Sequence, residues 1–156
     1  MTDTIVKQDE GQVLDVLGDR VRILATAEQT GGIFGAIEEI VPPGGGAPLH
    51  VNSRESLAWY VAEGTLQFTT DGEVADLSAG SWFYTPAGSA HTFHNATDKP
   101  ARALMIAFPG GFEGMFSEVG RTLAAGEVTR PPTDEEIGKL MATAPRYGLE
   151  IIAPPA

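Results

Sequence analysis

The chain is built from short apolar segments separated by turn residues. Its 156 residues include 19 glycines and 11 prolines. Between residues 11 and 110 the turn signals recur about every 8–12 residues, the spacing of an antiparallel sandwich or barrel. Asp71-Gly72, flanked by alternating apolar residues, is typical of a two-residue hairpin turn. We therefore expect residues 11–110 to form an all-β barrel of about nine or ten short strands.

The two ends of the chain have different patterns. Residues 1–10 are polar and predict a flexible N-terminal arm. After the predicted strands, apolar residues recur at helical spacing, which predicts an amphipathic helix over residues 111–125. Thr133 and Glu136 have the spacing of a capping box and predict the start of a second helix. We expect residues 111–156 to form a helical cap on the barrel, within the same domain, with a tail that either pairs as an edge strand or packs down.

The first predicted strands contain a hairpin turn and a pair of adjacent glutamates. The first hairpin is predicted to turn at Gly18-Asp19. Glu38 and Glu39 are adjacent, so a regular strand would send them to opposite faces of the sheet. We favour a bulge or a solvent-facing strand end here over a carboxylate inside the barrel.

The composition excludes several classes of partner and site. Without cysteine the chain has no disulfide, thiolate metal site or cysteine nucleophile. The formal net charge of −11 repels nucleic acid phosphates and anionic lipid, so we expect neither nucleic acid nor a membrane as a partner. The first residues lack the pattern of a signal peptide, and no apolar run reaches membrane-spanning length, so we expect a cytoplasmic protein.

Two histidines lie in the stretch from Gly44 to Asn95 that organises the predicted barrel. The first is His50, which follows Gly44 after five residues. The second belongs to a regularly spaced set, Gly80, Pro86, Gly88, His91 and Asn95. Imidazoles on strands at two places in a small barrel are suited to a metal site or to acid/base work.

These two segments resemble the two motifs of the cupin superfamily. Residues 13–150 look most similar to single-domain, quercetin-dioxygenase-like cupins. The resemblance implies a double-stranded β-helix, which is a jelly-roll barrel, followed here by two short C-terminal helices. It also implies a homodimer, for which exposed aromatic residues such as Tyr60 or Trp82 would suit the interface.

The metal-ligand pattern of the family is incomplete in this chain. Metal-binding cupins supply two His and one Glu from the first motif and one His from the second. Here His50 and His91 match, Asn52 replaces a histidine and Leu57 replaces the glutamate. An amide oxygen is a weak donor and leucine is none, so we expect no metal. If Fe, Mn, Ni or Zn is bound, the expected ligands are His50, Asn52, Glu55 and His91.

The residues of the predicted pocket are compatible with more than one function. We expect it to be lined by Asn52, Leu57, Trp59, Phe93 and Asn95, with His50, His91 and Tyr84 as the catalytic candidates. We favour a small-molecule enzyme in which His50 and His91 perform metal-independent acid/base chemistry, of an isomerase, cyclase or lyase type, on an apolar or aromatic metabolite. The alternatives are a metal-dependent, dioxygenase-like cupin with a remodelled site and a non-catalytic small-molecule-binding cupin.

Overall fold

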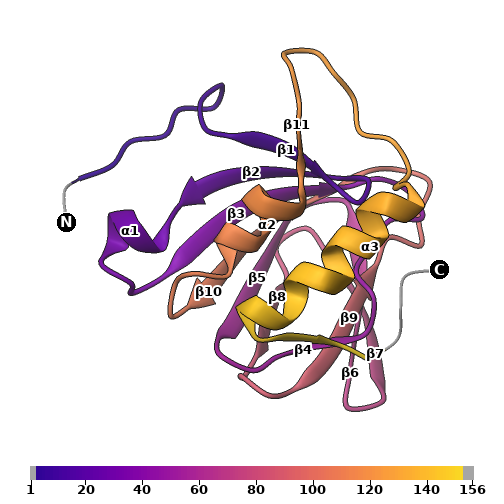
Figure 1. The fold of residues 1–156 in the computed structure, drawn as a ribbon. Helices are drawn as coiled ribbons and strands as arrows, with labels where there is room; N and C mark the ends of the chain where they lie inside the picture. Colours follow the sequence, from indigo (N-terminus) through magenta and orange to yellow (C-terminus); the bar gives the residue numbers. More distant parts are fainter. Residues whose placement is uncertain (1–2, 153–156) are drawn as a thin grey trace.

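Two antiparallel sheets face each other in the computed structural model, which describes residues 3–152 (Figure 1). The large sheet consists, in spatial order, of β11 (Arg121–Thr122), β1 (Val13–Val16), β2 (Asp19–Ala25), β3 (Gly35–Val41), β10 (Ala101–Phe108), β5 (Ser56–Glu63) and β8 (Trp82–Thr85). The small sheet consists of β12 (Leu149–Ile151), β4 (His50–Asn52), β9 (Ala90–His94), β6 (Thr65–Thr70) and β7 (Glu73–Ser78). The predicted all-β jelly-roll barrel is confirmed.

Aromatic side chains fill the interior on the side of β6 and β8. Phe68 stacks on Phe83 with ring centroids 4.7 Å apart, and Trp59 lies 4.9 Å from Phe93. These side chains come from four strands of the two facing sheets, and burying each contributes about 2–3 kcal/mol. This cluster therefore holds the two sheets together. The opposite side of the interior is covered by the C-terminal segment, described below.

The first hairpin turns one residue earlier than predicted. Leu17 and Gly18 both have positive φ, at 53° and 97°, as a two-residue hairpin turn of the primed kind requires. The amide of Gly18 donates to Oδ1 of Asp15 over 2.8 Å, which fixes the turn. As a result Asp19 is the first residue of β2, and its side chain is buried between the sheets instead of lying in the turn.

Glu39 enters the barrel, contrary to the prediction. The pairing of β3 with β10 runs without a shift through Glu38 and Glu39, so no bulge separates the two residues. Glu38 lies on the outer face, where it accepts from Arg22 over 3.1 Å and from Arg102 over 3.2 Å. The alternation of a regular strand then sends Glu39 inward, where only 5% of it is exposed.

The C-terminal segment is a cap that also extends both sheets. Its helices are α2 (Glu113–Val119), α3 (Asp134–Thr143) and the 3-10 turn η1 (Ala144–Tyr147), and a further short helix, α1 (Ala27–Thr30), lies near the N-terminus. The helix predicted over residues 111–125 is shorter, because β11 pairs with β1. The capping box of Thr133 and Glu136 is present. The tail forms β12, an edge strand beside β4.

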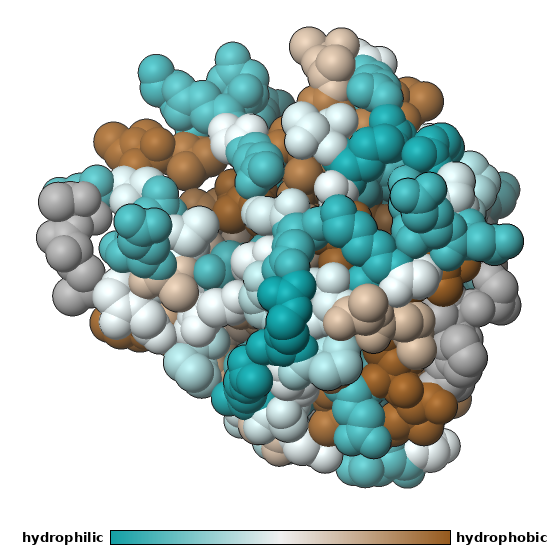
Figure 2. Space-filling view, viewed as in Figure 1, coloured by the Kyte–Doolittle hydropathy of each residue, from teal (hydrophilic) through white to brown (hydrophobic). Residues whose placement is uncertain are grey.

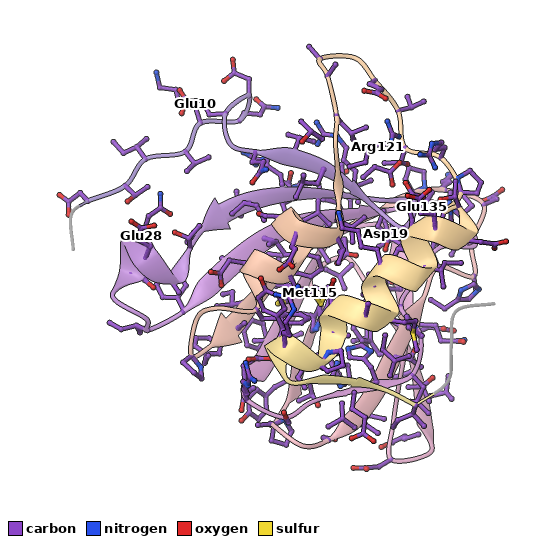
Figure 3. The ribbon with its side chains drawn as sticks, in the orientation of Figure 1. Glu10, Asp19, Glu28, Met115, Arg121 and Glu135 are labelled. Carbon is purple, nitrogen blue, oxygen red and sulfur yellow. The ribbon has the colours of Figure 1, made fainter. Side chains whose placement is uncertain are left out.

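The outside of the cap is polar. Hydrophilic side chains run along α3 in Figure 2, and in Figure 3 Glu135 projects from α3 while Met115 and Asp19 point inward. Within the described residues, no helix is long and apolar enough to cross a membrane. The cytoplasmic location stays a prediction.

The predicted N-terminal arm is hydrogen-bonded to the barrel through its last residues, 7–10. Arg22 donates to the carbonyl oxygens of Lys7 and Glu10 over 3.0 and 3.1 Å. Residues 1–2 of this arm, and residues 153–156 of the predicted cap, lie outside the described part of the chain.

Asn95 is a structural residue and does not line the pocket, as had been expected from its place in the motif. Its amide nitrogen donates to the carbonyls of Val41 and Lys99 over 3.0 and 2.7 Å. Its oxygen accepts from the amide and the hydroxyl of Thr97 over 3.0 and 2.7 Å. Asn95 is fully buried, so one of its hydrogen bonds fastens the end of β9 to Val41 in β3, and the other three hold the following turn at Thr97 and Lys99.

We predict that Asn95→Ala lowers the free energy of unfolding by about 3 kcal/mol, because a buried hydrogen-bond network loses its centre. Chemical denaturation measures this loss. The neighbouring exposed residue provides the control, since His94→Ala is expected to change stability by less than about 0.5 kcal/mol. Equal stability of the two variants would contradict the structural role of Asn95.

Candidate functional site

His50 and His91 form a directly opposed pair on β4 and β9. Their ring centroids are 4.3 Å apart, with an angle of 62° between the rings. Nδ1 of His50 lies 2.7 Å from the carbonyl oxygen of Pro48, and Nδ1 of His91 lies 3.1 Å from that of Ser89. A carbonyl oxygen can only accept, so each Nδ1 carries the proton and each Nε2 has a free lone pair.

Both imidazoles are uncharged at neutral pH. Burial, followed by the nearby His91, lowers the pKa of His50 from 6.5 to about 4, although the Pro48 carbonyl and the Asn52 amide act in the opposite direction. Burial also lowers the pKa of His91. With their Nδ1 protons directed to the backbone, the two rings offer lone pairs, and a proton donor for acid/base chemistry must come from elsewhere.

The donors around the histidines do not fit the shell of a resident transition metal. Nδ2 of Asn52 donates to Oε1 of Glu55 over 3.1 Å, so the carboxyl group of Glu55 is bound to the Asn52 amide. In residues 3–152, however, no group of three or more His, Cys, Asp or Glu side chains is close enough to hold a metal ion. Leu57 is buried at the position where the resemblance places a glutamate. Two imidazoles and an amide oxygen fall short of the three or four basic donors that iron or zinc requires.

Two polar atoms at the histidines lack partners. Nε2 of His91 and Oδ1 of Asn52 are both buried, and neither makes a hydrogen bond to any described residue. Burial raises the pKa of the Glu55 carboxyl, even though Asn52 donates to it. This side of the barrel therefore contains mainly uncharged acceptors.

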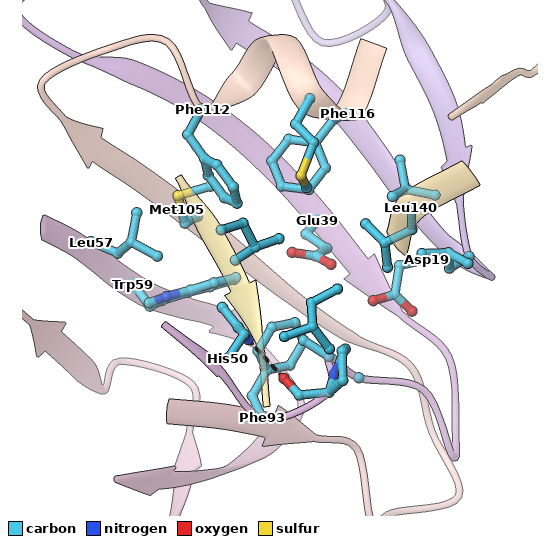
Figure 4. A pocket seen from close by; sticks show the side chains of 18 residues that line it. Asp19, Glu39, His50, Leu57, Trp59, Phe93, Met105, Phe112, Phe116 and Leu140 are labelled. Carbon is cyan, nitrogen blue, oxygen red and sulfur yellow. Dashed lines mark hydrogen bonds between the residues drawn. The ribbon is translucent and has the colours of Figure 1, made fainter. Parts of the chain in front are cut away.

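A cavity of about 80 Å³ lies between the barrel and the cap (Figure 4). His50, Leu57, Trp59 and Phe93 line it as predicted, whereas Asn52, His91 and Asn95 do not. Sequence reasoning missed the side chains that the cap contributes, which are Phe112, Met115, Phe116, Leu140, Leu149 and Ile151. Their apolar periodicity was visible in the sequence, but it did not show which surface they would cover.

Asp19 and Glu39 line the same cavity and were not predicted as site residues. Figure 4 shows their carboxyl groups side by side, with His50 on the other side of the cavity. The two carboxyl groups lie next to each other away from solvent, and burial raises the pKa of both. The available signal was the parity of Glu39 with the apolar residues Ile37 and Val41 of its strand.

Tyr84 is on the outer face of the large sheet, so the prediction that it reaches the pocket is wrong. It pairs with Ala58 and is 56% exposed, while the neighbouring Phe83 turns inward onto Phe68. Tyr60 and Trp82 share the outer face with it and are also exposed. The homodimer that these residues would suit stays a prediction.

Comparison with known proteins agrees with this architecture. A family model described as "Cupin domain" matches residues 37–107. The chain is similar to the quercetin 2,3-dioxygenase of Bacillus subtilis (strain 168), with 26% identity over 117 residues. The match covers 74% of this chain and 34% of that enzyme, so the chain spans about a third of that relative's length.

Solved structures share the fold at lower sequence identity. KdgF from Halomonas sp. has a TM-score of 0.65 at 20% identity, covering 72% of this chain and 99% of that one. An RmlC-like cupin from Shewanella frigidimarina has a TM-score of 0.62 at 19% identity, covering 70% and 93%. Together with the barrel and the two motifs, these matches show that the chain has the cupin fold and matches the cupin domain model over residues 37–107.

Proposed function

We propose that this cupin is a small-molecule enzyme that performs metal-independent acid/base chemistry, of an isomerase, cyclase or lyase type, on a largely apolar metabolite. One observation carries the proposal. His50 presents an imidazole that is uncharged at neutral pH to an apolar cavity, with Nδ1 bound to the Pro48 carbonyl and the lone pair of Nε2 left to take a proton. A base placed this way acts without a metal ion.

His50 and His91 have different roles in this proposal. His50 lines the cavity and is the base, whereas His91 lies behind it and does not reach the cavity. His91 positions the His50 ring by cross-strand contact and lowers its pKa. Tyr84 has no part in the chemistry, because its side chain is on the outer face.

The ligand we propose has a small reactive end and a larger remainder. A typical ligand pocket has at least about 300 Å³, so the 80 Å³ cavity takes only a few atoms. A groove of about 690 Å³ lies beside it, lined by residues 42–49 and 129–132, and Asp19 and Pro48 belong to the walls of both spaces. A metabolite in the groove, with its reactive end in the cavity, places that end near His50.

We predict that His50→Gln reduces turnover by about 10²-fold or more, because the general base is lost. The measurement is product formation from a metabolite mixture by chelator-treated protein, with ligand retention followed by native mass spectrometry. Tyr84→Phe is the control, since Tyr84 is exposed on the outer face and lines neither the cavity nor the groove. We expect the control and the chelated wild type to remain fully active.

Two other results would select the alternative functions. Ligand retention without product, in the wild type and in every variant, would identify a binding protein. Stoichiometric Fe, Mn, Ni or Zn that His50→Ala abolishes would identify a remodelled metal site and overturn the metal-independent mechanism.

His50 also makes the stability depend on pH. Unfolded His50 takes a proton below about pH 6.5, but folded His50 does so only at about pH 4. Its effect on stability is therefore absent above this window and increasingly unfavourable as the pH falls through it. Converted at 1.36 kcal/mol per pH unit, the full shift is on the order of 3 kcal/mol.

We predict that His50→Gln reduces the loss of stability between pH 7 and pH 4 by up to about 3 kcal/mol relative to the wild type. Denaturant unfolding at a series of pH values measures this difference. Trp82→Phe, an exposed substitution that involves no ionisable group, should leave the pH dependence of the wild type unchanged. Identical curves for all three proteins would mean that folded His50 keeps an ordinary pKa.

A further inference from the structure

Asp19 and Glu39 differ from the other buried acidic residues. Asp15 forms an ion pair with Arg121 over 2.8 Å. Glu113 accepts the amide protons of Ala27 and Gly111, over 2.8 and 2.7 Å. In the described part of the chain neither Asp19 nor Glu39 has an ion-pair partner, and their carboxyl groups lie side by side. Two adjacent carboxylates away from water repel each other, and one proton held between them removes this repulsion.

The pair is held on the inner face of two adjacent strands. Glu39 lies opposite Val21, and Asp19 precedes Val21 by two residues, so the two carboxyl groups are diagonal neighbours. Both side chains are about 95% buried, with 4% of Asp19 and 5% of Glu39 exposed. Oδ1 of Asp19 is buried and has no hydrogen-bond partner among residues 3–152, which leaves it available to a ligand.

Nothing in the packing requires carboxyl groups at these two positions. The neighbouring inward side chains Val21, Ile37 and Val41 are apolar and fully buried. Burying a carboxyl pair without a cation is less favourable than burying apolar side chains of similar volume. Clusters of this kind are more typical of a functional site than of a stabilising core.

We propose that Asp19 and Glu39 share one proton and donate it to an oxygen of the substrate, as the acid partner of His50. The substrate class is then a compound with a carbonyl group in its small reactive end, bound with a C–H bond facing His50. This proposal rests on the proposed function, because His50 must act as the base. It supplies the proton donor that the two imidazoles cannot provide.

The proton balance is closed within the cavity. Nε2 of His50 takes the proton of the C–H bond next to the carbonyl group, and the electron pair of that bond forms a C=C bond. The carbonyl oxygen takes the shared proton of Asp19 and Glu39, and an enol results. Return of a proton from His50 to carbon, and of the O–H proton to the carboxyl pair, regenerates both groups. No oxidant, reductant or co-reactant is consumed.

If the pair served only to stabilise the fold, replacing either carboxyl group by an amide would lower the free energy of unfolding at pH 7. Burial raises the pKa of both carboxyl groups, so their contribution to stability is present below about pH 4 and is lost as the pH rises through their folded pKa values. Glu39→Gln removes this loss and keeps a hydrogen-bond donor for Asp19. We predict that Glu39→Gln and Asp19→Asn are at least as stable as the wild type at pH 7, measured by denaturant unfolding. A clear loss of stability in both variants would show that the pair is structural.

The decisive experiment measures exchange of hydrogen for deuterium at the methyl carbons of acetone in D₂O, followed by proton NMR. Acetone is a small ketone, and this exchange uses only the enolisation step. We predict that the wild type accelerates exchange over buffer, and that Glu39→Gln slows the protein-catalysed rate by about 10²-fold. Glu38→Gln is the matched control, because Glu38 lies on the outer face of the same strand.

The outcomes separate the two proposals. If His50→Gln and Glu39→Gln both lose exchange while Glu38→Gln keeps it, the acid and base roles are supported. If only His50→Gln loses exchange, the proton-donor role is overturned and the proposed function stands. If only Glu39→Gln loses it, His50 is not the base. Exchange no faster than buffer in all proteins overturns both proposals, whereas the absence of an infrared band of a protonated carboxyl group that Glu39→Gln removes overturns the proton-donor role alone.

Discussion

The exclusion of water from the barrel interior is the constraint on which the site depends. The two sheets enclose an apolar space, and α2, α3 and β12 close the side that the aromatic cluster leaves open. Charge is unfavourable in such a space, so each inward polar group must lose its charge or find a partner. His50 remains uncharged in this way, and burial raises the pKa of the two inward carboxyl groups, which favours their uncharged form.

This constraint connects the incomplete metal-ligand pattern to the proposed chemistry. Asn52 and Leu57 occupy two positions where the family has metal ligands. Within residues 3–152, the two histidines therefore have too few basic donors around them to complete a metal site. Their backbone hydrogen bonds still fix the rings with Nε2 unprotonated. The same orientation that suits a metal ligand also suits a base, so a change at Asn52 or Leu57 changes the chemistry without altering the barrel.

The sequence was sufficient for the barrel, the two motifs and the capping box, because alternation, turn residues and local spacing determine these features. Trp59 and Phe93 were correctly placed inside for the same reason. The errors concern Asp19, Glu39, Tyr84 and Asn95. A one-residue shift of the first turn and the absence of a bulge in β3 placed two carboxyl groups inside. The alternation of β8 placed Tyr84 on the outer face. Hydrogen bonds to β3 and to the turn after β9 use both the nitrogen and the oxygen of the Asn95 side chain. These outcomes depend on register and tertiary contacts, which a local pattern does not specify.

The pairing of β12 with β4 has a consequence for the order of folding. His50 lies opposite Ile151, and Asn52 lies opposite Leu149, so the strand that carries His50 borders a segment synthesised about a hundred residues later. Closing a contact of such long sequence separation costs more chain entropy than closing a local one. During synthesis, the side of the barrel that carries His50 therefore remains uncovered until the last strand has been made.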